Sequence, residues 1–223
     1  RPAPAPARPA EVNEEDLATA AFQGASVETN PDLDSLLRHT NTYIAEGRYR
    51  EAALVLQHII DESGNVLTTP DHRHYTLIRD EIERRLANLP GDGLDVYRLV
   101  SDGDAKALLA NAQGMQEEPN LQTITQRFFV TSVGDDAAFR LACLYMDQYR
   151  FTAARMLLRK ILLTHPDYAP PGPPSAFRPQ PNLDRGGMFI RLALASIRVS
   201  DLDTARWALA QLAQETRTSV PPD

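Results

Sequence analysis

Runs of apolar residues at three- and four-residue steps alternate with short polar breaks along this chain, a pattern typical of successive amphipathic helices. The first run extends from Asp32 to about Gly47, and glycine is common just past a helix end. A second run begins at Tyr49 and stops at Ser63–Gly64. Because so few residues separate the two runs, they predict an antiparallel αα-hairpin.

The middle of the chain predicts several shorter helices. A run over 75–89 has charged residues on its other face, 79–85, which we expect to be a solvated surface with salt bridges. Shorter helical pieces are expected at 94–100 and 105–112, and another over 121–129. No segment shows the period-two alternation of a strand, so the predicted fold class is all-α.

Two further hairpins are expected in the C-terminal half. A helix through Tyr145, with Asp135 or Asp136 as its N-cap, precedes a helix over Phe151–Thr164. Pro166 prevents that second helix from continuing. The last pair of helices is expected at residues 188–198 and 203–214.

The composition divides the chain into five parts. Residues 1–30 form a Pro/Ala-rich and then acidic segment, which we expect to be a disordered tail, and 31–165 form the helical repeat domain. Residues 166–184 are a proline-rich loop with polyproline character, either a surface connector or a strap on which a partner docks. Residues 185–216 hold the terminal hairpin of the same domain, and 217–223 are a linker.

The hairpins repeat a common set of positions. An aromatic residue or leucine at the turn is followed three residues later by alanine, and four residues beyond that by leucine. The aligned sets are Tyr49, Ala52 and Leu56; Phe151, Ala154 and Leu158; and Leu202, Ala205 and Leu209. These positions resemble the tetratricopeptide repeat family. The chain departs from that pattern because Tyr149 replaces the usual glycine, Ser196 replaces an aromatic residue, and the units are not in tandem.

The resemblance implies a degenerate tetratricopeptide-like α-solenoid in which the first helix of each hairpin lines a concave groove. An apolar helix or strap would bind there, or the chain's own middle helices would fill it. The family's carboxylate clamp pairs a base with asparagine, whereas Asn41 lies one turn from Leu37, so capture of a terminal carboxylate is not expected. Transferred by position, the groove residues are Leu37, Asn41, Ile44, Phe139, Cys143, Met146, Ile190, Leu194, Ile197 and Arg198.

The middle of the chain carries a second resemblance, in Arg127-Phe128-Phe129, Thr131 and Gly134-Asp135. This pattern is similar to the N-terminal helical region of exported planctomycete-type proteins that continue into PQQ-like β-propeller repeats. The resemblance implies that the Pro/Ala-rich start is a tether left after a leader. It also implies that the end at Val220-Pro221-Pro222 precedes a propeller.

Charge and composition exclude several functions. A net charge of −7 and a pI near 5.3 argue against a broad nucleic-acid surface and against a polybasic membrane patch. No run of 18 apolar residues is present, so no transmembrane segment is expected. The single cysteine, Cys143, allows no intrachain disulfide and is interpreted as a small core residue.

The chemical inventory predicts no catalytic residue, no cofactor and no metal. His72 and His74 are near one another, but we interpret them as part of a solvated loop because a third ligand is lacking. The basic residues of the stretch 150–160 have two interpretations: they cover apolar surface with their stems, or they meet an acidic partner or phosphate. These basic residues are Arg150, Arg155, Arg159 and Lys160.

These observations favour a non-catalytic scaffold for protein–protein interaction, a module of a larger exported protein in the periplasm or cell envelope of a bacterium. A cytoplasmic location is the alternative. The partner would be a protein or peptide, or the chain's own following domain. Two other functions remain open: an accessory helical domain of a propeller or quinoprotein-like enzyme whose chemistry lies outside this chain, and a self-assembling structural protein that forms a homo-oligomer.

Overall fold

The computed structural model describes residues 31–68, 76–163 and 184–218. The expected tail at 1–30, nearly all of the proline-rich loop at 166–184, His72, His74 and the chain end after 218 lie outside these residues. The described residues are mostly helical, which confirms the coarse prediction of fold class.

Nine α-helices, a short 3-10 helix and two very short strands make up the described part of the chain. Their bounds are α2 (Pro31–Ala45), α3 (Tyr49–Ser63), β1 (Leu67–Thr68), β2 (Thr76–Leu77), α4 (Ile78–Ala87), α5 (Gly93–Ala110), η1 (Gly114–Gln116), α6 (Glu117–Arg127), α7 (Gly134–Asp147), α8 (Phe151–Leu163), α9 (Arg185–Arg198) and α10 (Leu202–Thr218).

Three local predictions were wrong. The strands β1 and β2 pair antiparallel, with Leu67 opposite Leu77, and two residues are too few to show alternation. Since β2 uses Thr76 and Leu77, α4 begins later than the expected residue 75. The segments 94–100 and 105–112 belong to one continuous helix, α5, because a single glycine at position 103 weakens a helix without ending it.

The N-cap prediction for α7 was also wrong. Val133 occupies that position, while Asp135 and Asp136 lie in the first turn. There their carboxylates still face the positive end of the helix dipole. Gly134 begins this helix against the backbone of Phe129, where a Cβ atom would lie 2.0 Å from the carbonyl oxygen. The chain therefore needs glycine at this close approach.

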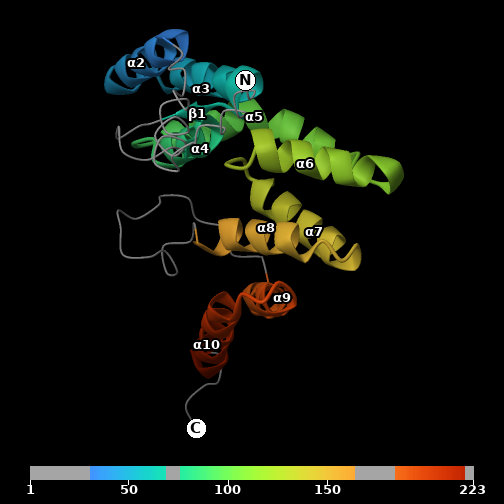
Figure 1. Ribbon diagram of the computed structural model, residues 1–223. Coiled ribbons are helices and arrows are strands. Elements are labelled where there is room, and N and C mark those ends of the chain that lie inside the picture. Colours follow the sequence, from blue (N-terminus) through green and yellow to red (C-terminus); the bar gives the residue numbers. More distant parts are fainter. Residues whose placement is uncertain (1–30, 69–75, 164–183, 219–223) are drawn as a thin grey trace, which may run out of the picture.

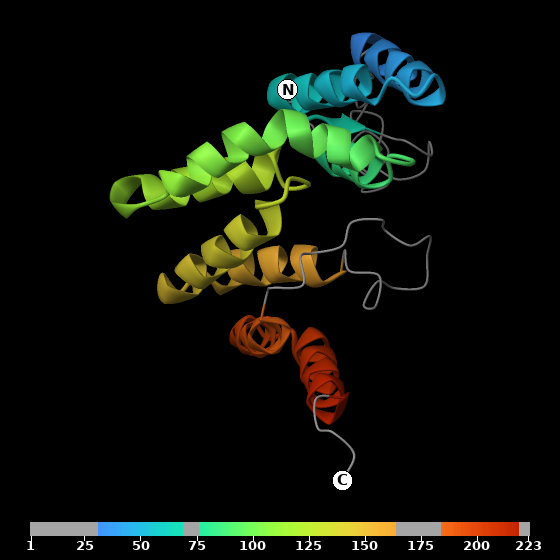
Figure 2. The same cartoon turned by 180° about the vertical axis from the view of Figure 1, so that it is seen from behind.

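The helices follow one another in chain order along an elongated arrangement, from α2 at one end to α10 at the other (Figures 1 and 2). Neighbouring helices α2 and α3, α7 and α8, and α9 and α10 pack against each other, as do α6 on α7 and α8 on α9. Between the first two hairpins, α4, α5 and α6 form the middle of the arrangement. One apolar cluster extends through it, from Leu33 on α2 to Ala208 on α10.

The three hairpins share one turn. Gly47, Tyr149 and Ser200 occupy equivalent positions and all have left-handed backbones, with φ of 72°, 61° and 62°. In each turn the next amide donates to a carbonyl five residues earlier, which closes the helix end. These bonds are Arg48 N to Tyr43 O at 2.8 Å, Arg150 N to Tyr145 O at 2.8 Å, and Asp201 N to Ser196 O at 2.9 Å.

We expect Ser200→Gly to raise the free energy of unfolding by about 1 kcal/mol, because glycine adopts a left-handed backbone without the steric cost of a Cβ atom. Gly47→Ala should lower it by about the same amount, since nothing lies within 4 Å of the added methyl group and only the backbone cost remains. Urea unfolding of the full chain measures both changes. Equal stabilities for Ser200→Gly and wild type would contradict the shared turn geometry.

Candidate functional site

The basic stretch 150–160, which consists of Arg150 and most of α8, contacts three other parts of the chain. Arg150 donates to Glu118 of α6 at 2.5 Å, and Arg155 pairs with Asp201 just before α10. Lys160 Nζ lies 2.7 Å from Glu83 Oε2 on α4. Arg159 is exposed and, among the described residues, has no hydrogen-bond or ion-pair partner. Three of the four cations therefore bind the chain's own acids, and one remains available.

A cleft of about 640 Å³ lies between α4, α6, α7 and α8. This volume is in the range of small-molecule sites. Apolar groups dominate the walls, and the loop between α6 and α7 contributes two of them. The apolar lining residues are Leu77, Ala87, Phe129, Val130, Leu141, Met156 and Leu157.

A buried ion pair forms part of the cleft wall. Lys160 Nζ also lies 4.1 Å from the centre of the Phe129 ring, so the ammonium group has both a carboxylate and an aromatic face as neighbours. Burial raises the pKa of Glu83, and the charge and hydrogen bond of Lys160 oppose this rise. A buried pair of this kind is costly to break, because the remaining partner keeps its desolvation penalty.

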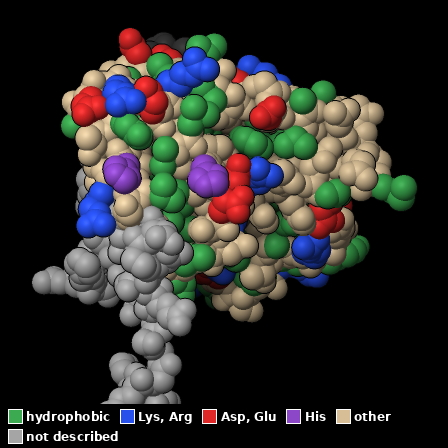
Figure 3. All heavy atoms as spheres, turned by 90° about the horizontal axis from the view of Figure 1, so that it is seen from above, with side chains coloured by type: hydrophobic (Ala, Val, Ile, Leu, Met, Phe, Trp, Pro, Cys, Tyr) green, Lys and Arg blue, Asp and Glu red, His purple; other side chains and the backbone are tan. Residues whose placement is uncertain are grey.

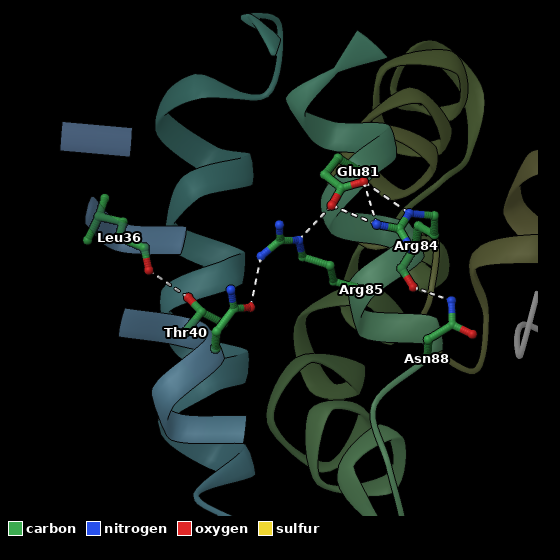
Figure 4. Close-up of polar contacts among 7 residues, drawn as sticks. Leu36, Thr40, Glu81, Arg84, Arg85 and Asn88 are labelled. Atoms are coloured by element: carbon green, nitrogen blue, oxygen red, sulfur yellow. Dashed lines mark hydrogen bonds and ion pairs between the residues drawn. The ribbon is translucent and has the colours of Figure 1, made fainter. Parts of the chain in front are cut away.

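The charged face of α4 is less solvated than predicted. Glu81 is only 4% exposed and accepts hydrogen bonds from Arg84 and Arg85, at 2.8 Å and 2.7 Å (Figure 4). Arg85 also donates from Nη1 to Asn41 Oδ1 at 3.1 Å, which ties α4 to α2. The periodicity of α4 alone assigns Glu81 to solvent. In the structure α4 packs against α3 and is tied to α2, and Glu81 is buried.

Asn41 therefore has a basic neighbour that its own helix does not supply. One turn before Asn41 on its own helix lies Leu37, as expected, and the base that contacts its side chain is Arg85 of α4. That guanidinium already binds the carboxylate of Glu81 (Figure 4). The pair is a structural tie between helices.

The expected groove residues are divided between distant parts of the molecule. Leu37, Asn41 and Ile44 belong to α2, at the opposite end of the arrangement from α9 (Figures 1 and 2). Leu37 is buried in the core, and Ile44 packs partly against it. The structure does not bring these three residues together with those of α7 and α9.

The residues of α7 and α9 lie closer to one another. Phe139 and Met146 are half-buried against the core, Cys143 is half-buried, and the guanidinium of Arg191 lies 5.4 Å from the Phe139 ring centre. Arg198 is exposed and lies 5.1 Å from the ring centre of Phe151. Next to them, α9 exposes a row of apolar side chains at steps of four and three residues, which we call the α9 stripe. It consists of Ile190, Leu194 and Ile197, at 46%, 50% and 49% exposure.

Other features of the described residues offer little chemistry. The described residues contain no group of three or more His, Cys, Asp or Glu side chains that could hold a metal ion. The cleft lining includes no histidine, cysteine or serine among the described residues. Figure 3 shows acidic, basic and hydrophobic side chains interspersed over the α2–α3 end, without a patch of one sign.

None of the helices in the described part of the chain has both the length and the hydropathy needed to cross a bilayer. Comparisons with protein-family models, with curated proteins and with solved structures returned no match to this chain.

Sequence reasoning identified the α9 stripe but missed the cleft. Ile190 and Leu194 were found through their position in the repeat. Glu83 and Phe129 come from segments far from α8 in the sequence, and only the packing of α4 and α6 beside α8 makes them neighbours of Lys160. One signal was present: Lys160 is one of only two lysines in a chain whose cations are otherwise arginines.

Lys160→Met should leave the Glu83 carboxylate without its cation and lower the free energy of unfolding by about 3 kcal/mol at pH 7. Removing Lys160 should raise the folded-state pKa of Glu83 further. A raised folded-state pKa means that stability is retained at low pH and lost as the pH rises. Urea unfolding at pH 5 and pH 8 should therefore show a larger loss at pH 8.

The double variant Glu83→Gln/Lys160→Met is the control, because it has no carboxylate at this position and should not lose stability between the two pH values. If the single variant loses the same amount at pH 5 and pH 8, the Glu83–Lys160 pair is not buried in solution.

Proposed function

We propose that this chain is a non-catalytic helical scaffold that binds a protein partner through the α9 stripe. The observation that carries the proposal is the row of half-exposed Ile190, Leu194 and Ile197. Covering each of these side chains would contribute about 1 kcal/mol of hydrophobic stabilisation. A row at helical spacing suits the apolar face of a partner helix lying along α9.

The shared turns support a repeat interpretation of the scaffold. Gly47, Tyr149 and Ser200 adopt the same backbone conformation, although only one of them is glycine. The same register places buried alanines at Ala52, Ala154 and Ala205. We propose on this basis that the hairpins are degenerate tetratricopeptide-like units of an α-solenoid, in which α7 and α9 supply a recognition surface.

A further layer packed on α10 is a second candidate partner, and it corresponds to a following domain of a larger protein. At the repeat position that faces the next layer, Leu56 and Leu158 are fully buried, whereas Leu209 is 49% exposed. Leu202 on the same helix is similarly exposed. Terminal units of helical arrays usually have polar outer faces, so this surface favours a role as one module of a longer assembly. We extend the proposal to an exported protein of the bacterial cell envelope, on compositional grounds alone.

Selection of a random peptide library on the immobilised full chain tests the scaffold proposal. Enriched peptides should carry apolar residues at helical spacing. Their affinity should fall at least about tenfold for the variant Ile190→Ser/Leu194→Ser, because two central apolar contacts are lost. A matched control is Leu54→Ser, which changes a 49%-exposed leucine on α3 and should leave binding unchanged.

Light scattering over a range of concentrations separates binding of a foreign partner from self-assembly. A measured mass that rises from one chain to two as the concentration increases, in wild type but not in Ile190→Ser/Leu194→Ser, would favour a homo-oligomer formed through the α9 stripe. A monomeric chain for which no peptide is enriched would contradict the proposed function.

A further inference from the structure

We propose that the cleft between α4, α6, α7 and α8 binds a small amphipathic anion, an acidic group on an apolar body. This site is separate from the α9 stripe and does not depend on the scaffold proposal. The argument uses the shape of the cleft, the nature of its walls and the balance of charge around it.

The walls of the cleft suit an apolar body. A cavity of about 640 Å³ holds a ligand of drug or lipid-fragment size, and its aromatic and aliphatic lining favours groups that leave water. Phe129 and Val130 come from the buried loop between α6 and α7, so this part of the wall is fixed by the core. Met156 is 64% exposed at the rim, and its flexible side chain can adapt to the shape of an occupant.

Cations outnumber acids around the same cavity. Among the described residues, the basic ones in the lining are Arg79, Arg84, Arg159 and Lys160, whereas the acidic ones are Asp80 and Glu83. The local balance is thus positive in a chain whose net charge is −7. Positive potential beside an apolar cavity is stronger than on an open surface, because low-dielectric walls focus the field.

Among the described residues of the lining, Arg159 is the cation without a partner. Arg84 is already bound to Glu81, Arg79 donates to Asn65, and Lys160 is paired with Glu83. Arg159 has no hydrogen-bond or ion-pair partner among the described residues, and its neighbour in sequence, Lys160, neutralises Glu83, one of the two carboxylates in the lining. A guanidinium with free donors suits bidentate binding of a carboxylate, sulfonate or phosphate.

The test uses two fluorescent probes that share one ring system. Anilinonaphthalene sulfonate carries an anionic group, and phenylnaphthylamine is its neutral counterpart. Titrated into the full chain, the sulfonate should bind at one site per chain and about fivefold more tightly than the neutral probe, the effect of one exposed charge contact. Added salt should weaken binding of the sulfonate and leave binding of the neutral probe unchanged.

Variants at the rim locate the site. Arg159→Gln should lower the affinity for the sulfonate about fivefold and leave the affinity for the neutral probe unchanged. Met156→Glu should also lower the affinity for the sulfonate. Both side chains are exposed, so the variants should fold as wild type does. Arg206→Gln, which removes an exposed arginine on α10, is the matched control and should have no effect.

Three results would overturn the proposal. Equal affinities for the two probes that do not respond to Arg159→Gln would show that the cleft does not select an anion. Sulfonate binding that is lost in Leu194→Ser but kept in Arg159→Gln would place the probe on the α9 stripe. If neither probe binds, the cleft is closed or filled in solution and offers no ligand site.

Discussion

Burial of an alanine on the second helix of each hairpin is the constraint on which the rest of this structure depends. Ala52, Ala154 and Ala205 are almost fully buried, and a larger side chain there would push its neighbours apart. Leu56 and Leu158, four residues beyond the first two alanines, are also fully buried and belong to one continuous apolar cluster. The left-handed turns follow from the same geometry, because they reverse the chain within a few residues of each crossing.

Ion pairs between layers stabilise the helix packing in addition to the apolar core. The acids that pair with Arg150 and with α8 come from α4, from α6 and from the turn just before α10, so one short stretch connects three parts of the described chain. The same packing creates the cleft. Lys160 of α8 reaches Glu83 of α4 and the Phe129 ring, and all three residues line the cavity. The residues that stabilise this packing therefore also line the candidate ligand site.

The helices were predictable where periodicity and turn residues agreed. The bounds of α2 and α3 follow the predicted runs closely, because Pro31, Gly47 and Gly64 lie at or near their ends, and α8 begins at the predicted Phe151. Errors occurred where a local signal was ambiguous, as at Gly103, which the continuous helix α5 tolerates, and at Thr76–Leu77, a strand too short to show a period. Of the candidate site, the sequence predicted Ile190 and Leu194 on α9. It could not predict that α2 lies far from them.

The sequence by itself determined the helical class, the hairpins and their common register, because these depend on periodicity and on residues close together in the chain. Tertiary structure alone decided which charges are buried and which remain available. Glu81 and Glu83 look like surface residues on α4, yet both are buried, and of the sequence neighbours Arg159 and Lys160 only Lys160 pairs with an acid among the described residues. Such differences arise from contacts between segments distant in sequence, and no local pattern encodes them.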